Sequence, residues 1–379
     1  MEENGNRKEL YHSYLVIHTG HIRENIAGIL RTLPEGVQLI PVLKANAYGL
    51  GMEKMAGILQ EFPEIRMLAA AQVREGVQLR EAGWEREILI LGAAATETQQ
   101  RAALEKDLTL TVYRPGFLRE MAELARMYAK KVKLHCKINT GMNRLGMKPG
   151  DELAEVIEEF RENQDVIEMQ GAFSHFADLL SAKREMAERQ FGIFMEGIEQ
   201  LETAGIHVSM RHICASAAWE MYPEFCLDAV RIGRRLYYDH PLCPKGNVQD
   251  AASWRGRIID VRERKNGEMI GYGGKTVLKK DSRIALVGIG YGDGMLQSFA
   301  GLHAPVLVNG KKAHLLKCCM DQCFVDVSGI PCAIGDEATF FGYDAEGNLL
   351  PGREIAGLIG DEACTLTAAL GERVLRVWE

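Results

Sequence analysis

The sequence predicts an α/β protein, in which an N-terminal (β/α)8 TIM barrel is followed by a mostly antiparallel β-domain. Two observations predict this fold class. Through the first two thirds of the 379 residues, short apolar runs alternate with segments whose apolar residues recur at helical spacing. After about residue 245 this alternation stops and turn signals become frequent. We therefore expect a barrel over residues 1–245 and a β-domain over residues 246–379.

Eight apolar runs are candidates for the barrel strands. Most of them contain few alternating polar residues, which is typical of strands buried on both faces of a parallel sheet. In chain order they are residues 38–45, 67–71, 87–93, 108–113, 132–138, 169–175, 207–213 and 227–233. Helix-period segments such as 51–62, 71–83, 115–131 and 182–205 lie between them. The interval before the last run is the least helix-like.

The second part of the chain has the pattern of short strands joined by tight turns. Turn signals stand at residues 265–268, 291–294, 308–311 and 345–348, as KNGE, YGDG, VNGK and AEGN. The expected strands between and around them are residues 255–261, 283–290, 304–310, 323–328 and 337–343. Residues 241–251, with two prolines and a glycine, are the expected connection between the two domains.

Composition excludes several classes of protein. A net charge of -7 argues against a sequence-independent grip on nucleic acid, which requires a basic surface. No apolar run is long enough to span a membrane, and the charged N-terminus lacks the apolar core of a secretory signal. The nine cysteines are scattered without a zinc-ligand pattern, so reduced thiols are a better interpretation than a metal centre. We expect a cytoplasmic protein without metal.

The ends of the first and fifth runs carry candidate functional residues, because barrel enzymes place their active groups at the C-terminal ends of the strands. Lys44 closes the first run, where partial desolvation would favour its uncharged amine. A snorkelling surface lysine is the alternative. Tyr48 follows in a glycine-terminated turn, where its hydroxyl could contact a ligand held by Lys44. Lys137 ends the fifth run, and Arg144 lies in the loop after it.

The last three runs add further polar groups to the same mouth. His175 ends the sixth run, although a single histidine is more often a hydrogen-bonded core residue. Small residues at 215–218, including Ser216, follow the seventh run and could hold a phosphate at a helix N-terminus. Arg231 and Gly233 lie in the eighth run. A lysine amine, a phosphate seat and arginines together indicate a site for pyridoxal 5'-phosphate.

These residues lie in motifs that resemble those of the alanine racemase family, which are fold-type III enzymes that bind pyridoxal phosphate. The resemblance covers nearly the whole chain, with the motifs in the family's order. They are VLKANAYGLG (42–51), KINTGMNRLG (137–146), GAFSHFA (171–177), VRIG (230–233), IGYGG (270–274), GIGYGDG (288–294), CMDQC (319–323) and ALGERVLR (369–376). Chance agreement over so many motifs in register is not a serious competitor.

The resemblance implies a role for each matching residue. Lys44 would bind the cofactor and act as base on one face of the amino acid. Tyr272 would act on the opposite face, from the other subunit of a head-to-tail homodimer with shared active sites. Arg231 would hydrogen-bond the pyridine nitrogen, with His175 orienting it and Tyr272. The remaining implied contacts are Arg144 and the often carbamylated Lys137 beside it, Met320 and Tyr291 for the substrate, and Tyr48, Ser216, Gly233 and the backbone of Arg234 for the phosphate.

Physical chemistry agrees with these implied roles. Racemisation removes the α-proton on one face and returns it on the other, so the two bases must flank the cofactor plane. An arginine at the ring nitrogen has too high a pKa to give up its proton. The ring nitrogen would stay unprotonated, which weakens the electron sink and suppresses side reactions. IGYGG alone is also compatible with a simple glycine turn. GIGYGDG lies in a hairpin-rich region with no helix after it, which argues against a nucleotide loop.

Several positions depart from the family's usual pattern. Cys364-Thr365 stands where a Tyr-Glu pair is usual, and Arg234 where an apolar residue is common. Tyr238-Asp239 replaces a glycine, Asn139 an aspartate and Ala215 an asparagine. The missing tyrosine ring and the added charge concern the entrance and the phosphate seat. We therefore expect the same reaction with specificity relaxed towards small amino acids such as serine.

The leading prediction is an isomerase, an alanine racemase that interconverts L- and D-alanine for cell-wall synthesis. The alternatives are a racemase of serine or of several small amino acids, a barrel that binds pyridoxal phosphate without catalysis, and a fold-type III decarboxylase. The non-catalytic proteins resemble the barrel alone, so Tyr272 and CMDQC in the second domain argue against them. The decarboxylases have other motifs.

Overall fold

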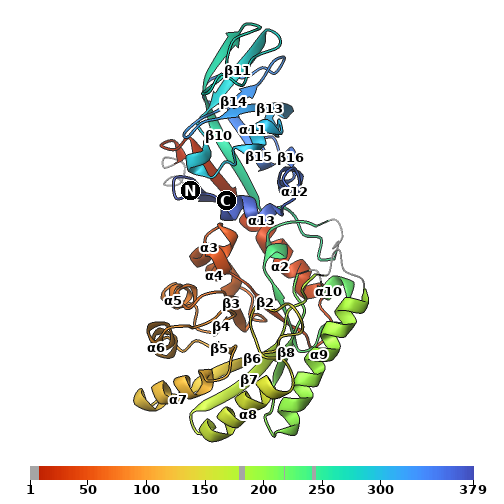
Figure 1. The fold of residues 1–379 in the computed structure, drawn as a ribbon. Coiled ribbons are helices and arrows are strands. Elements are labelled where there is room, and N and C mark those ends of the chain that lie inside the picture. Colours follow the sequence, from red (N-terminus) through yellow and green to blue (C-terminus); the bar gives the residue numbers. More distant parts are fainter. Residues whose placement is uncertain (1–7, 179–183, 217, 241–244) are drawn as a thin grey trace.

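The computed structural model describes residues 8–178, 184–216, 218–240 and 245–379. Residues 182–183 of one expected helix, Ala217 of the small-residue loop and residues 241–244 of the expected connection lie outside this part. The described chain forms a parallel-strand barrel and, above it in Figure 1, a mostly antiparallel β structure. The predicted fold class is confirmed.

All eight expected barrel strands are present. They are β2 (Gln38–Pro41), β3 (Met67–Ala70), β4 (Glu87–Ile90), β5 (Leu110–Val112), β6 (Val132–Lys137), β7 (Ile167–Phe173), β8 (Met210–His212) and β9 (Ala229–Ile232). Neighbouring strands are parallel, and three isolated bridges, Val42–Ala69, Leu89–Thr109 and Ala215–Arg231, link the paired groups. Pairing of β2 with β9 closes the barrel.

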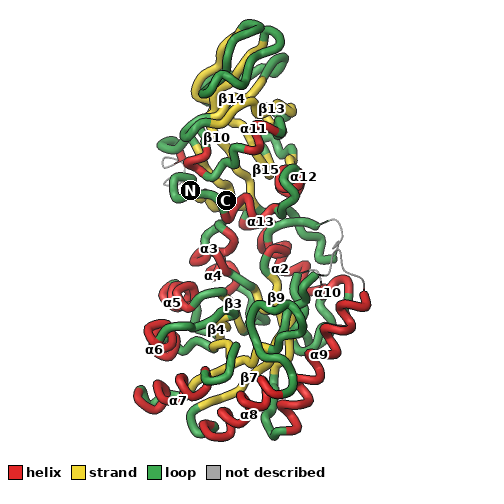
Figure 2. The backbone as a smooth tube through the Cα atoms, in the orientation of Figure 1, coloured by secondary structure: helices red, strands yellow, loops and turns green. Residues whose placement is uncertain are grey.

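The helices surround the barrel because each has one apolar face to bury. α7 (Phe117–Met127) shows this clearly, since its Phe117, Leu118 and Met121 are buried while Arg119 and Glu123 point outward. The others in this part are α2 (Thr19–Thr32), α3 (Lys44–Tyr48), α4 (Met52–Gln60), α5 (Val73–Glu81), α6 (Glu97–Glu105), α8 (Asp151–Asn163), α9 (Arg184–Thr203) and α10 (Ala218–Met221), with the 3-10 turns η1 (Pro223–Phe225) and η2 (Arg234–Leu236). Figure 2 shows the helices outside the strands.

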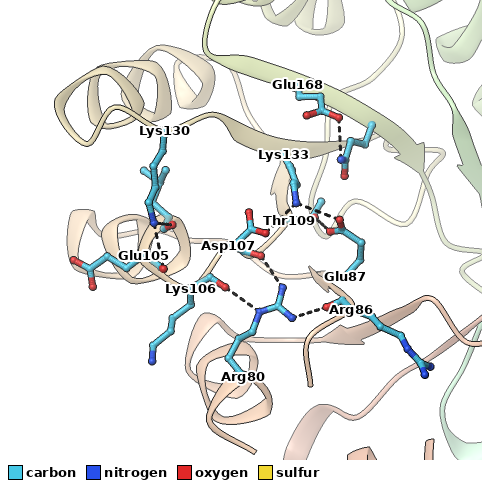
Figure 3. Close-up of polar contacts among 12 residues, drawn as sticks. Arg80, Arg86, Glu87, Glu105, Lys106, Asp107, Thr109, Lys130, Lys133 and Glu168 are labelled. Atoms are coloured by element: carbon cyan, nitrogen blue, oxygen red, sulfur yellow. Dashed lines mark hydrogen bonds and ion pairs between the residues drawn. The ribbon is translucent and has the colours of Figure 1, made fainter. Parts of the chain in front are cut away.

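Polar side chains line the floor of the barrel, at the N-terminal ends of the strands. Lys133 Nζ lies 3.2 Å from a Glu87 carboxylate oxygen and 3.0 Å from Asp107, and the Thr109 hydroxyl donates to Glu87 over 3.1 Å (Figure 3). These half-exposed pairs join β4, β5 and β6, and each contributes little on its own to stability. The floor of the barrel is therefore polar.

The second part of the chain is one nine-stranded sheet with small helices on it. Its elements are β10 (Ala252–Arg264), β11 (Ser282–Val287), η3 (Tyr291–Asp293), α11 (Ser298–Gly301), β12 (Pro305–Val308), β13 (Lys311–Cys318), β14 (Cys323–Asp326), β15 (Glu337–Tyr343), β16 (Leu349–Leu350), α12 (Gly352–Gly357), α13 (Ala363–Ala368) and β17 (Leu375–Trp378). All five expected strands are present. The expectations omitted β13, β16, β17 and β1 (Ser13–Ile17), which pairs with β10 and β17 and not with the barrel.

Two of the turn signals have clear structural consequences. Asn309 and Gly310 both have positive φ, 48° and 73°, and form the two-residue turn of the β12–β13 hairpin. KNGE at 265–268 does not make a tight hairpin, because β10 and β11 pair only as far as Arg264 and Ser282. The chain between them, 265–281, extends beyond the sheet, and it carries Tyr272.

The barrel mouth and the upper sheet meet at α3 and α13 (Figure 1). A Cβ on Gly49, which has φ +87°, would lie 2.0 Å from the Thr367 carbonyl oxygen, so only glycine permits this approach. Arg376 donates to the Gly49 carbonyl over 3.1 Å, and the Tyr238 hydroxyl donates to Thr367 over 2.8 Å. The upper sheet thus supports the segment that carries Lys44. Among the described helices, none has the length and apolarity needed to cross a bilayer.

Candidate active site

A cavity of about 460 Å³ opens at the C-terminal ends of the barrel strands. Every barrel residue proposed from the sequence borders it, together with apolar and small residues of the same loops. The lining consists of Val42, Lys44, Tyr48, Leu91, Lys137, Arg144, Phe173, His175, Phe176, Ala177, Asp178, Ala215, Ser216, Arg231, Gly233 and Arg234. Positions scattered over nearly 200 residues therefore converge on one site, as the barrel topology requires.

Lys44 is presented by a left-handed helical turn. Ala45, Asn46, Ala47 and Tyr48 have φ of 51°, 55°, 52° and 57°, a conformation that side chains normally avoid. Ordinary strand geometry ends at Pro41, so the expectation that Lys44 closes the strand is wrong. The expected desolvation is also not seen in the single chain, because Lys44 is exposed. The turn places Lys44 and Tyr48 on the same cavity.

A buried glutamate stabilises this strained turn. Glu75 accepts hydrogen bonds from the backbone N–H groups of Ala45 at 2.7 Å, Ala71 at 2.8 Å and Gln72 at 3.0 Å. At the other end, the Asn46 side chain accepts from Met52 N–H over 2.7 Å. The sequence reasoning did not identify Glu75. Its spacing from Gln72 fits a capping box at the start of α5, but nothing local indicates that it also reaches Ala45.

Arg231 is buried and has no carboxylate partner among the described residues. Its Nη1 donates to His212 Nδ1 at 2.7 Å and to the His212 carbonyl at 2.9 Å. Its Nη2 has acceptors at Ser174 O (2.6 Å), His175 Nδ1 (3.2 Å) and Ile213 O (3.2 Å). These acceptors account for four of the five N–H donors of a guanidinium. The remaining Nε–H finds no acceptor in the described chain, and the side chain lines the cavity.

Burial and the charge of Arg231 favour the neutral forms of His175 and Lys137. Burial, followed by the positive field of Arg231, holds the pKa of His175 well below its usual value. Burial also lowers the pKa of Lys137, and Arg231 and Arg144 lower it further. The Lys137 amine lies 4.1 Å from the centre of the Phe173 ring. Burial lowers the pKa of Arg231 only to about 10, so this residue stays charged at neutral pH.

Tyr48, Ser216 and Gly233 also line the cavity and lie close to one another. Gly233 N–H donates to the Ser216 hydroxyl over 3.4 Å. A Cβ on Gly233 would lie 2.0 Å from the Tyr48 hydroxyl, so glycine is what allows this hydroxyl to lie against the backbone. Helix α10, which follows Ser216, is a single turn and not the longer helix that a phosphate site usually uses.

Two of the residues that depart from the family's pattern, Arg234 and Cys364, lie beside this group. Arg234 forms an ion pair with Glu362, next to α13. The pKa of the half-buried Cys364 thiol is raised, mainly by burial. The positive charges of Arg234 and Lys44 partly offset this rise. Asn139 retains the turn-forming function of an aspartate, because its Oδ1 accepts from the N–H groups of Gly141 at 3.0 Å and Asn143 at 3.1 Å.

Tyr272, Tyr291 and Met320 do not reach this cavity in the same chain. Their side chains are 80%, 40% and 53% exposed. All three lie near Cys319. Met320 follows it in the chain, and the Tyr291 N–H donates to the Cys319 carbonyl over 3.0 Å. Gly271 precedes Tyr272, and a Cβ on Gly271 would lie 3.7 Å from the Cys319 sulfur. The structure therefore divides the residues proposed from the sequence into two groups, one at the barrel mouth and one on the upper sheet.

Comparison with known proteins bears on both parts of the chain. Residues 17–241 match the family model of the alanine racemase N-terminal domain, and residues 251–378 match that of the C-terminal domain. The chain is 35% identical over 364 residues to an alanine racemase of Desulforamulus reducens, covering 94% of this chain and 96% of the relative. It is 33% identical over 362 residues to alanine racemase 2 of Caldanaerobacter subterraneus subsp. tengcongensis, covering 94% and 92%.

Solved structures agree with these matches. The alanine racemase of Clostridium difficile 630 superposes with a TM-score of 0.89 at 28% identity, covering 97% of this chain and 95% of that one. The alanine racemase of Streptomyces lavendulae gives the same TM-score and identity, covering 97% of both chains. The resemblance found in the sequence motifs is confirmed. The chain belongs to the alanine racemase family.

Proposed function

We propose that this chain is an alanine racemase that interconverts L- and D-alanine with pyridoxal 5'-phosphate bound in the Lys44 cavity. One observation carries the proposal. Arg231 is charged and buried, has no carboxylate partner and one unused N–H among the described residues, and lines a cavity that Lys44 lines as well. This donor suits an aromatic ring nitrogen, which accepts a hydrogen bond but takes no proton from arginine. The names of the relatives supply the substrate.

The remaining lining residues fit the same cofactor. Lys44 is the residue we assign to covalent attachment at the cofactor's aldehyde carbon. Tyr48, Ser216 and the backbone N–H groups of Gly233 and Arg234 form the seat we assign to the phosphate. Arg144, exposed and without an ion pair among the described residues, suits the phenolic oxygen and the substrate carboxylate. Each assignment uses a group that the protein leaves available.

The reaction then follows from where the two bases stand. The bound cofactor supplies an electron sink for the pair of electrons left when the α-proton departs. The Lys44 amine takes or returns that proton on one face. The Tyr272 hydroxyl does the same on the opposite face, and His175 holds this hydroxyl through its Nε2–H, since its Nδ1 accepts from Arg231. Because Arg231 keeps its own proton, the sink stays weak and the proton is returned quickly.

Tyr272 has to come from a second subunit. In the single chain it is exposed and lies with Tyr291 and Met320 on the upper sheet, away from the Lys44 cavity. A head-to-tail dimer would bring this group over the neighbouring barrel mouth, complete both cavities and bury Lys44. Such a dimer is closed and symmetric, with two equivalent sites.

Lys137 is the residue we expect to carry a carbamate. Its amine is buried, and its lowered pKa leaves the uncharged form that attacks carbon dioxide. The product carboxylate would lie where Arg144 and Arg231 now have no counter-ion among the described residues. Protein incubated with 13C-labelled bicarbonate should show a carbamate signal by 13C NMR that Lys137→Met abolishes. An identical signal in that variant would contradict the assignment.

The experiment that tests the proposed function combines visible absorbance with detection of the product enantiomer. Reconstituted native protein should bind pyridoxal phosphate with an absorbance in the visible range and convert L-alanine to D-alanine. Lys44→Ala should lose both the covalent chromophore and turnover. The rate of serine racemisation, measured in parallel, shows how far Cys364 and Arg234 relax the specificity for alanine. Protein that stays colourless with added cofactor would refute the proposal.

A further inference from the structure

A continuous chain of hydrogen bonds runs from Arg231 into the barrel core through two histidines. Arg231 Nη1 lies 2.7 Å from His212 Nδ1, and His212 Nε2 lies 2.9 Å from His135 Nδ1. Both histidine side chains are fully buried, on β8 and β6. His135 Nε2 has no partner among the described residues. The chain therefore has one end at the cavity and the other in the lower barrel.

The chemistry of the donors fixes the direction of every bond in this chain. Arginine can only donate, so His212 Nδ1 must accept and its proton must be on Nε2. That N–H donates to His135 Nδ1, which in turn requires the His135 proton on Nε2. Both rings are therefore neutral Nε2–H tautomers. Burial and the charge of Arg231 favour the same state, because they lower the pKa of His135 to about 3 and that of His212 well below its usual value.

Packing prevents either ring from reorienting. The Phe173 ring stacks on His212 with a centroid distance of 5.1 Å and an angle of 1° between the ring planes. A Cβ on Gly171 would lie 2.8 Å from His135 Nδ1, so this glycine permits His135 to lie against β7. With both rings fixed in place, the choice of tautomer is the one freedom left to His212.

We infer that His135 is a positioning residue for Arg231: its Nδ1 lone pair holds His212 in the Nε2–H tautomer and so keeps an acceptor facing the guanidinium. The inference rests on the proposed role of Arg231 at the ring nitrogen. Without the His135 lone pair, the His212 Nε2–H is a buried donor with no acceptor. Moving the proton to Nδ1 relieves that loss, but it places an N–H against Arg231 Nη1. Arg231 then turns, and its Nε–H leaves the direction of the cavity.

The His135 Nε2–H, at the far end of the hydrogen-bond chain, does not need an acceptor from the protein. His135 borders a cavity of about 380 Å³ in the barrel floor, together with polar side chains of the strand starts such as Gln38, Glu87 and Gln170. Glu87 and Glu168 in this region are already engaged by Lys133 and Gln170 (Figure 3). A water in this cavity is a sufficient acceptor for His135 Nε2–H, so the direction of the chain needs no further ionised group.

Three substitutions of His135 separate positioning from filling space. In His135→Asn the amide oxygen takes the place of Nδ1 and keeps the acceptor. His135→Leu removes the acceptor. In His135→Gln the longer side chain places its amide near the former position of Nε2 and leaves no acceptor at that of Nδ1. Gln serves as a second acceptor-free variant if Leu does not fold. The first readout is the histidine 15N NMR spectrum of protein without cofactor, with His212 assigned by its own substitution.

Native protein and His135→Asn should show His212 as the neutral Nε2–H tautomer at pH 7. His135→Leu and His135→Gln should show the Nδ1–H tautomer, and their affinity for pyridoxal phosphate should fall about tenfold, the effect of one misdirected charged hydrogen bond. Affinity in His135→Asn should stay within about threefold of native. If His212 keeps its Nε2–H in both acceptor-free variants, the inference is wrong. Because the spectrum needs no cofactor, that result is distinct from a failure of the proposed function.

Discussion

The seat that we propose for the phosphate requires a residue without a Cβ at position 233. Gly233 has a negative φ of -116°, and the need for glycine that the structure shows here comes from the space around this residue. The Tyr48 hydroxyl would lie 2.0 Å from an added Cβ. Tyr48 is half-buried, and desolvation raises its pKa, so this hydroxyl stays protonated and acts as a donor.

We predict that Gly233→Ala displaces the Tyr48 hydroxyl and weakens cofactor binding about tenfold, the effect of losing one hydrogen bond to a charged group. Tyr48→Phe should weaken it by a similar amount. The double variant should be no worse than either single variant, because both remove the same contact. Equilibrium binding of pyridoxal phosphate measures all three. Additive losses would show that the two residues act separately.

Residue types at the strand ends and in the loops after them were sufficient to predict several polar residues of the cavity lining. Lys44, Arg144, His175 and Arg231 all line one cavity, as the barrel rule required. The residues that escaped prediction act through a second residue. Glu75 supports Lys44 through a backbone N–H in another loop, and His212 and His135 support Arg231 from the core. Such contacts depend on which side chains meet in space, and no local pattern records that.

At the scale of elements, α3 shows how much strain the site contains. Four successive residues with side chains occupy the left-handed region, at a cost of roughly 1–2 kcal/mol each. The Glu75 hydrogen bonds and the packing of α13 on Gly49 offset this cost. The apolar run before Lys44 predicted a strand continuing through residue 45. It could not reveal the turn, because alanine and asparagine are ordinary residues in other conformations.

We predict that Ala45→Gly raises the unfolding free energy by up to about 1 kcal/mol, since glycine adopts positive φ without strain. Ala45 is exposed, so little packing is lost. Ala154→Gly is the matched control: Ala154 is exposed in the right-handed helix α8, and there glycine should cost about 1 kcal/mol. Urea unfolding of the two variants should give opposite signs. Destabilisation by both would mean that the strain at Ala45 is negligible.

Among the strands, those predicted correctly stand out as local apolar runs. β1 is also apolar, SYLVI, but its partners β10 and β17 lie more than 200 residues along the chain. Spacing and composition near residue 15 cannot show that this strand joins the upper sheet. The extension at 265–281 was similarly invisible, because KNGE signals a turn but does not give the length of the segment between the two strands.

For the whole molecule, the separation of the two residue groups predicts complementation between inactive variants. Lys44→Ala damages the barrel site, and Tyr272→Phe damages the group on the upper sheet. In a mixed dimer one site carries both changes and the other carries neither. Unfolding and refolding the two variants together should restore about a quarter of native activity, because half the dimers are mixed and each has one intact site. Mixtures that recover no activity would show that Tyr272 acts within its own chain.

Stability of the whole molecule should depend on pH through its buried histidines. Burial lowers the pKa of His135 to about 3, and it lowers those of His175 and His212 well below the ordinary 6.5. Their folded forms thus bind fewer protons than the unfolded chain once the pH falls below about 6.5. Above that pH they contribute no dependence. Below it, the unfolding free energy should decrease by about 1.4 kcal/mol per pH unit for each histidine.

The window from pH 6.5 to 5 isolates this effect, because ordinary carboxyl groups titrate below it. Urea unfolding at fixed protein concentration should give a slope of more than three protons near pH 5 for the native chain, because His18, whose pKa burial lowers to about 4, contributes together with these three histidines. His135→Asn should reduce that slope by one proton while keeping the acceptor for His212. An unchanged slope would mean that His135 is protonated equally in the folded and unfolded chains. That result would remove the neutral ring on which the direction of the Arg231 hydrogen-bond chain depends.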